Sequence, residues 1–180
     1  MFDDKRSRKV IFVSHCVLNQ DAKLDACAHY PGAIKEVTEL LVEAGAGIIQ
    51  LPCPELLYLG LDRDADRAAD LTVASEDSRI ARRMVEEGAL TLCGKLADDV
   101  LRQMMEYRKH GFEVLGLVGI NGSPTCGVET TWREDEERDG PGIFIKVLAK
   151  KLEKAGTSLK ITGIKANDPE RAVAAVKNLL

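Results

Sequence analysis

Aromatic side chains are scarce in this sequence, which has three Tyr, four Phe and one Trp among its 180 residues. Proteins that bind single-stranded nucleic acid use such side chains as stacking platforms for the bases. The formal net charge is −4, so there is no overall electrostatic attraction to long nucleic acid either. We therefore expect no long nucleic acid as a partner.

Long hydrophobic runs are also missing. The first apolar run, Val10–Val13, follows a charged stretch and is too short for the hydrophobic region of a signal peptide. No run approaches the roughly 20 residues that cross a bilayer. The sequence therefore predicts a cytoplasmic protein without a membrane partner, folded as a single domain over residues 1–180, and it leaves the oligomeric state open.

The five cysteines include no C-x-x-C pair, and their number is odd. Neither feature is typical of a disulfide framework, and disulfides are rare in a reducing cytoplasm. Cysteines that cluster in the fold would then bind a metal or an iron–sulfur cluster, or act as nucleophiles.

What the sequence does contain is a regular alternation of strand-like and helix-like segments. Strands are expected at 10–14, 47–51, 113–120 and 159–164, where apolar and β-branched residues run together. Helices are expected to open at Pro31-Gly32, Ser75, Pro141-Gly142 and Asp168-Pro169, and Gly88 and Gly94 are candidate breaks in the second of them. This order predicts an α/β fold with a parallel sheet and helices on both faces.

Three cysteines follow three of the predicted strands. Cys16 and Cys53 lie just past the first two strands, and Cys126 lies six residues beyond the third. Because the carboxyl ends of parallel strands share one edge, where ligands bind, we expect these three thiols to converge. Cys93 is expected on a helix, with its side chain in the hydrophobic core of the protein, whereas Cys27 lies in a polar loop close to His29.

The spacing of the three cysteines restricts their chemistry. None is followed by Arg at the spacing of a C-x5-R phosphatase loop. Structural zinc usually has four ligands in closely spaced pairs, which these isolated cysteines do not provide. Three thiolates suit a [4Fe-4S] cluster better, since one iron then stays free for a substrate. A fourth ligand, such as His15 or Cys27, would instead saturate the site.

Two polar residues accompany these cysteines. Glu55 follows Cys53 by two residues, close enough to serve the same site as an acid or base. Ser123 precedes Cys126 by three residues, in a loop where Gly122 and Gly127 permit unusual backbone angles.

Taken together, the motifs S-x-C after the first strand, L-P-C-P-E after the second and N-G-S-P-T-C-G after the third resemble the thiouracil desulfidase family. The resemblance extends over residues 10–130. The segments VLNQDAKLDA and LLYLGLDRD, which follow the first and second motifs, depart from the family pattern. The resemblance is therefore to a divergent branch.

The resemblance implies a Rossmann-like α/β fold and a [4Fe-4S] cluster held by Cys16, Cys53 and Cys126. It implies catalytic roles for Glu55 and Ser123. The expected reaction removes sulfur from a thiolated pyrimidine such as 2-thiouracil, giving the oxo compound and sulfide. In this hypothesis the metal polarises the C=S bond, Glu55 activates water, and Ser123 holds that water or relays its proton.

Two alternatives remain open from the sequence. The chain could be a non-enzymatic iron–sulfur or zinc-binding module, or a transferase that passes sulfur to an acceptor. Both keep the three-cysteine site. The module would carry out no reaction, and the transferase would pass the sulfur to an acceptor instead of releasing sulfide.

Overall fold

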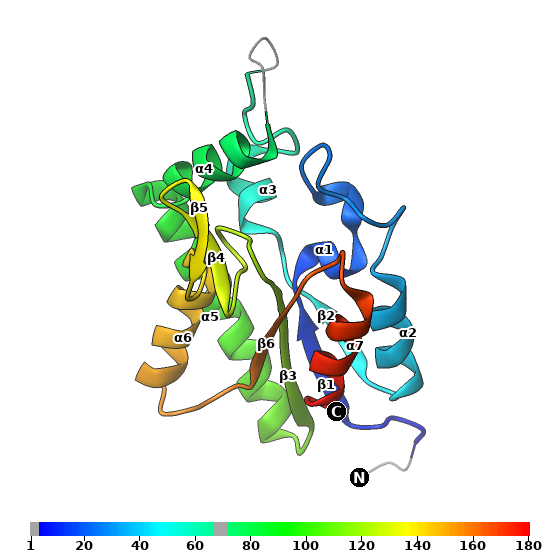
Figure 1. Cartoon of the computed structure of the whole chain (residues 1–180). Helices are drawn as coiled ribbons and strands as arrows, with labels where there is room; N and C mark the ends of the chain where they lie inside the picture. The colour runs from blue at the N-terminus through cyan, green and yellow to red at the C-terminus, as the bar shows by residue number, and fades with distance from the viewer. Residues whose placement is uncertain (1–3, 67–71) are drawn as a thin grey trace.

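The computed structural model describes residues 4–66 and 72–180 (Figure 1). Its central sheet has four parallel strands in the order β2-β1-β3-β6. Their bounds are β1 Lys9–Val13, β2 Gly47–Gln50, β3 Glu113–Ile120 and β6 Ile161–Ile164, each within two residues of the predicted strand. The predicted α/β class with a parallel sheet is confirmed.

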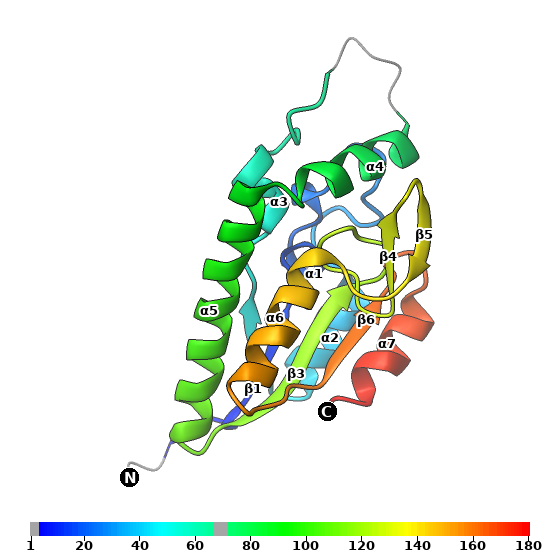
Figure 2. The same cartoon turned by 90° about the vertical axis from the view of Figure 1, so that its left-hand side faces the viewer.

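Helices cover both faces of the sheet. Their bounds are α1 His15–Leu18, the 3-10 turn η1 Gln20–Ala22, α2 Lys35–Glu43, α3 Pro54–Leu59, α4 Val73–Arg83, α5 Glu87–Lys109, α6 Ile143–Lys154 and α7 Pro169–Lys177. Figure 2 shows α5 and α6 on one side of the sheet and α7 on the other. Within the described ranges, no helix combines the length and the apolar character needed to span a bilayer.

The strands divide their side chains between two cores. Ile11 and Val13 of β1 pack with the buried residues of α2 and α7, whereas Phe12 packs with those of α5 and α6. This is the period-two alternation of a strand that is buried on both faces. Both cores exclude water from the sheet, so the polar site must lie at an edge.

The helix that was expected to open at Ser75 is two helices, but the predicted break points were wrong. Thr72 caps α4, and Ser75 completes a reciprocal capping box with it. The break falls at residues 84–86, while Gly88 and Gly94 both lie inside α5. A Cβ at Gly88 would lie 3.0 Å from the Tyr58 ring, so this glycine allows close packing and does not end a helix.

Several short elements were not predicted. Helices α1 and α3 and the antiparallel hairpin of β4 (Thr130–Arg133) and β5 (Glu136–Asp139) all lie in connections that follow strands. Runs of four to six residues are too short to show a helical period, and every residue of β5 is exposed, so it shows no alternation.

The cap of α7 tests the link between sequence and fold. Asp168 was predicted as the cap, and its Oδ1 accepts a hydrogen bond from the Arg171 amide at 3.2 Å. Asp168→Ala should lower the free energy of unfolding by about 1 kcal/mol, measured by urea denaturation. Asp168→Asn keeps an accepting oxygen and should lose much less. Equal losses in both variants would contradict the capping role.

Candidate functional site

A pocket of about 270 Å³ at the carboxyl edge of the sheet collects the predicted site residues. Cys16, Cys53, Cys126, Glu55 and Ser123 all line it. A larger hollow of about 740 Å³ lies beside it, and its lining contains none of these five residues. The structure therefore brings the predicted residues together in the smaller pocket.

The sheet positions each thiol through the segment that follows a strand. Cys16 lies in the first turn of α1, directly after β1. Cys53 is the N-cap of α3, and its Sγ accepts a hydrogen bond from the Leu56 amide at 3.5 Å. Pro54 occupies the first turn of that helix, where its fixed φ and missing N–H are tolerated.

Cys126 lies in a loop that its own side chains close. Ser123 Oγ accepts hydrogen bonds from the amides of Thr125 at 3.2 Å and Cys126 at 2.9 Å. Asn121 Oδ1 accepts bonds from two later amides of the loop at 3.3 and 3.1 Å. The Ile120 amide donates to the Cys126 carbonyl at 2.9 Å. These bonds fix the third thiol relative to the end of β3.

The two glycines of this loop serve different purposes. Gly122 has φ +82°, the left-handed region in which glycine is favoured, as the sequence predicts. Gly127 is not among the residues with positive φ. A Cβ at Gly127 would clash with the Thr130 and Ser123 carbonyl oxygens. That position needs glycine because two backbone segments approach each other closely there.

Burial favours the protonated form of all three thiols. It raises the pKa of Cys16 to about 12 and that of Cys53 to about 11. Burial also raises the pKa of Cys126, and the nearby Cys53, Glu55 and Cys16 raise it further. This mutual influence places the thiols close together. A thiol with a raised pKa is a poor nucleophile but becomes a thiolate ligand when a metal displaces its proton.

The donor set suits a cluster better than a single ion. In the part of the chain that the structure describes, no three His, Cys, Asp or Glu side chains are grouped to hold one metal ion. In a cubane cluster each thiolate binds a different iron, so the thiols need not surround one point. Ser14 Oγ and Thr125 Oγ1 are buried without an oxygen or nitrogen partner, and Ser14 lies against the Cys126 thiol. Such spare hydroxyls can donate to sulfur.

Arg63 is a site residue that sequence reasoning missed. Its side chain is 2% exposed, and its Nε lies 3.4 Å from Glu55 Oε2. Its Nη1 donates to the Gly60 and Leu61 carbonyls at 2.8 and 3.0 Å, and its Nη2 donates to the Ala22 carbonyl at 2.6 Å.

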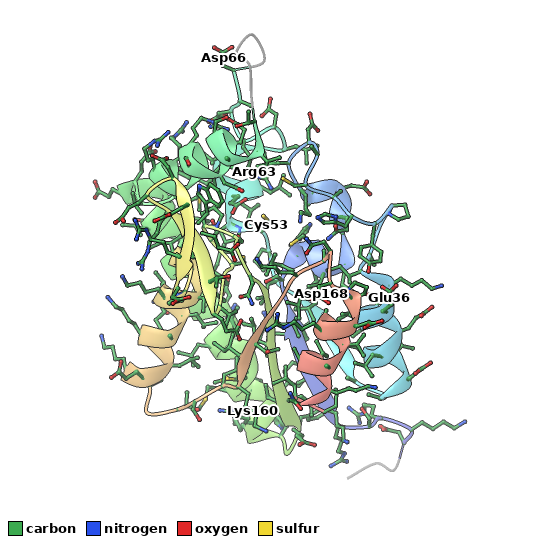
Figure 3. All side chains as sticks on the ribbon, in the orientation of Figure 1. Glu36, Cys53, Arg63, Asp66, Lys160 and Asp168 are labelled. Atoms are coloured by element: carbon green, nitrogen blue, oxygen red, sulfur yellow. The ribbon has the colours of Figure 1, made fainter. Side chains whose placement is uncertain are left out.

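Arg63 also reaches the thiol site. Its Nη2 lies 3.8 Å from Cys53 Sγ. Figure 3 shows Arg63 and Cys53 at one end of the molecule, opposite the end that carries Lys160. Within the segment LLYLGLDRD, only Gly60, Leu61 and Arg63 are comparable to the pattern of the thiouracil desulfidase family, and that likeness assigned no role to Arg63. Its φ of +58° is unusual for a residue with a side chain.

The remaining cysteines and His15 occupy different surroundings. Cys93 lies on α5 and is fully buried in the core, as predicted. Cys27 lines the same pocket as the three thiols, and burial raises its pKa. His15 is not among the residues that line this pocket. Of the two alternative fourth ligands, only Cys27 therefore lies at the site.

Comparison with known proteins gives one related sequence and one related structure. No family model matches the chain. An uncharacterized protein of Methanocaldococcus jannaschii is 30% identical over 165 residues, which span 92% of this chain and 91% of that protein. The crystal structure of a [4Fe-4S]-dependent thiouracil desulfidase aligns with a TM-score of 0.51 at 18% identity, over 96% of this chain and 99% of that one. At that identity the likeness concerns the fold.

The buried Arg63 makes a prediction about stability. Arg63→Ala leaves Glu55 without its buried cation and the Ala22 and Leu61 carbonyl oxygens without their donor, so we expect the free energy of unfolding to fall by about 3–5 kcal/mol. Urea denaturation measures the loss. Arg83→Ala is the control, because its ion pairs are exposed and should contribute less than about 1 kcal/mol. Similar losses in the two variants would show that Arg63 does not clamp the site.

Proposed function

We propose that this chain, which belongs to the same family as the uncharacterized protein of Methanocaldococcus jannaschii, is a [4Fe-4S]-dependent desulfidase. Its substrate is a thiolated pyrimidine such as 2-thiouracil, and its products are the oxo compound and sulfide. The convergence of three thiols with Glu55 in one pocket carries the proposal. The fold shared with a thiouracil desulfidase supports it.

Cys16, Cys53 and Cys126 are the proposed ligands. They reach the pocket from three neighbouring strand ends and provide soft donors of the kind that iron–sulfur clusters require. These three thiolates would hold the cluster, and a cluster held in this way would supply a thiophilic Lewis acid for polarising a C=S bond. The pocket, in turn, limits which molecules can reach the cluster.

Glu55 is the proposed general base. Its side chain is 15% exposed, and Arg63 holds it from the side of the protein at 3.4 Å. That contact fixes the carboxylate in a pocket that it shares with the thiols, so it can take the proton of an attacking water. The reaction adds one water to the thiocarbonyl compound and releases the carbonyl compound and hydrogen sulfide. It therefore needs no external reductant.

Ser123 has a narrower role than the sequence alone suggests. A hydroxyl has two acceptor lone pairs and one hydrogen. The amides of Thr125 and Cys126 use the acceptor side of Ser123 Oγ, so its hydrogen is what remains for the pocket. We assign Ser123 as a fixed donor that holds the substrate or the attacking water, not as a base.

The ligand assignment is tested by reconstitution. The wild-type chain, incubated anaerobically with iron and sulfide, should gain about four irons and broad visible absorbance. Replacing Cys16, Cys53 or Cys126 by Ala removes one thiolate, so we expect the iron content to fall well below that value. Iron analysis and absorbance measure the result. If one of these three variants keeps all four irons, the cysteine that it lacks is not a cluster ligand.

Cys93→Ala is the control, because Cys93 is buried in the core and does not line the pocket. It should keep the full iron content. Cys27→Ala separates the enzyme from a saturated, non-enzymatic site. Iron content should be unchanged under our proposal and should fall if Cys27 is a fourth ligand.

The catalytic role of Glu55 is tested with Glu55→Gln. The amide keeps the size of the side chain and an oxygen for Arg63 but cannot accept the proton of water. We expect full cluster content and a loss of about 10²–10⁴-fold in the rate of sulfide release from 2-thiouracil, measured by a sulfide assay. Glu39→Gln, on the exposed side of α2, should retain the wild-type rate. Near-normal turnover by Glu55→Gln would rule out Glu55 as the base.

A further inference from the structure

Helix α4 lies beyond the carboxyl ends of the strands (Figure 1), and its Asp77 lines the same pocket as the thiols. We propose that Asp77 recognises the substrate ring, binding the edge where a ring N–H stands next to a carbonyl or thiocarbonyl, with Trp132 as the aromatic wall beside it. This inference rests on the proposed function. It deepens that function by naming a residue that selects neutral, planar heterocyclic amides.

Asp77 differs from its neighbours in forming no hydrogen bond within the described ranges. Glu76 is held by Arg79 through bonds of 2.9 and 2.7 Å. Ser78 Oγ accepts a hydrogen bond from Trp132 Nε1 at 2.9 Å. Asp77 makes no hydrogen bond or ion pair with any described residue. Its neighbours fix the position of α4, and its own carboxyl group remains available to a ligand.

The surroundings of Asp77 favour its neutral form. Burial raises the pKa of this carboxyl group to about 7, and the charges of Glu55 and Glu76 add to the rise. Lys23 acts in the opposite direction. The other titratable groups that face the pocket near Asp77 include the Cys27 thiol and the His29 imidazole.

A neutral carboxyl group offers one donor and one acceptor side by side. A ring amide presents the complementary pair, so two hydrogen bonds can form at once. The ionised carboxylate has only acceptors and would leave the ring carbonyl without a donor, which is costly inside a pocket. Asp77 therefore distinguishes a ring that carries this edge from one in which the nitrogen is alkylated.

The size of the pocket limits the ligand further. Pockets for drug-sized ligands range from about 300 to 1,000 Å³, whereas this one has about 270 Å³, which the substrate would share with the proposed cluster. It suits a single heterocyclic ring without a sugar phosphate. The flat side chain of Trp132 is half-buried at the wall, and a planar ring can contact it.

The single tryptophan of the sequence makes this binding measurable without turnover. We would titrate the anaerobically reconstituted protein and the metal-free protein with uracil and follow the fluorescence of Trp132. Uracil carries the ring-amide edge, lacks the sulfur and stays neutral between pH 6 and 8. 1,3-Dimethyluracil has no N–H and serves as the control ligand.

We expect saturable quenching by uracil that is about tenfold weaker in apparent Kd at pH 8 than at pH 6. The sign follows from the protonated form being the binding form, whose population falls about tenfold between these pH values for a pKa of about 7. Dimethyluracil should bind at least tenfold more weakly than uracil at pH 6.

Three variants assign the effect. Asp77→Asn keeps a donor and an acceptor, so it should bind uracil at both pH values with nearly the wild-type affinity of pH 6. Asp77→Ala should lose about tenfold or more at pH 6. Asp135→Asn makes the same chemical change outside the pocket, where Asp135 forms an exposed ion pair with Arg82 of α4 at 3.5 Å, and should behave as wild type.

Three results would overturn the inference: no quenching by uracil in either form of the protein, wild-type binding by Asp77→Ala, or an unchanged pH dependence in Asp77→Asn. The last would assign the pH dependence to a group other than Asp77. The outcomes for the two proposals are separable. Uracil binding without sulfide release from 2-thiouracil contradicts the proposed function alone, whereas sulfide release without Asp77-dependent uracil binding contradicts this inference alone.

Discussion

The parallel pairing of β1 with both β2 and β3 is the constraint on which the site depends. Val13 is opposite Gln50 on one side and Val118 on the other, so all three strands end near one line. A slip of β1 by one residue would exchange Ile11 and Phe12 between the two cores. Burial on both faces therefore fixes the register, and the register fixes where Cys16 enters the pocket.

Much of this arrangement could be predicted because it depends on local patterns. Runs of apolar residues mark the four strands, and Asp168 marks the start of α7. The convergence of the thiols follows from topology once the sheet is parallel. The position of the helix break was mispredicted because Gly88 was interpreted as a helix breaker. In the fold this glycine lies inside α5 and makes room for Tyr58 of α3. A sequence window does not contain that neighbour.

The roles of Arg63 and Asp77 could not be predicted for a related reason. Arg63 donates a hydrogen bond to a carbonyl 41 positions earlier in the chain, and Asp77 is buried by segments that are distant in sequence. Both look like solvated charges in the sequence. In the fold, the two pocket carboxyl groups have different surroundings, since Glu55 has the buried Arg63 beside it, whereas no described residue forms an ion pair with Asp77. Our proposals assign them different roles on that basis, Glu55 as the proton acceptor and Asp77 as a neutral hydrogen-bonding group.

The clamp made by Arg63 also affects how the protein can change over evolutionary time. Its three hydrogen bonds to the chain end on backbone carbonyl oxygens of Ala22, Gly60 and Leu61. Every amino acid carries that oxygen, so the side chains at positions 22 and 61 can be replaced without removing an acceptor. Within the limits that packing sets at the buried Ala22, substitutions at these two positions therefore keep the acceptors that hold Arg63 beside Glu55 and Cys53.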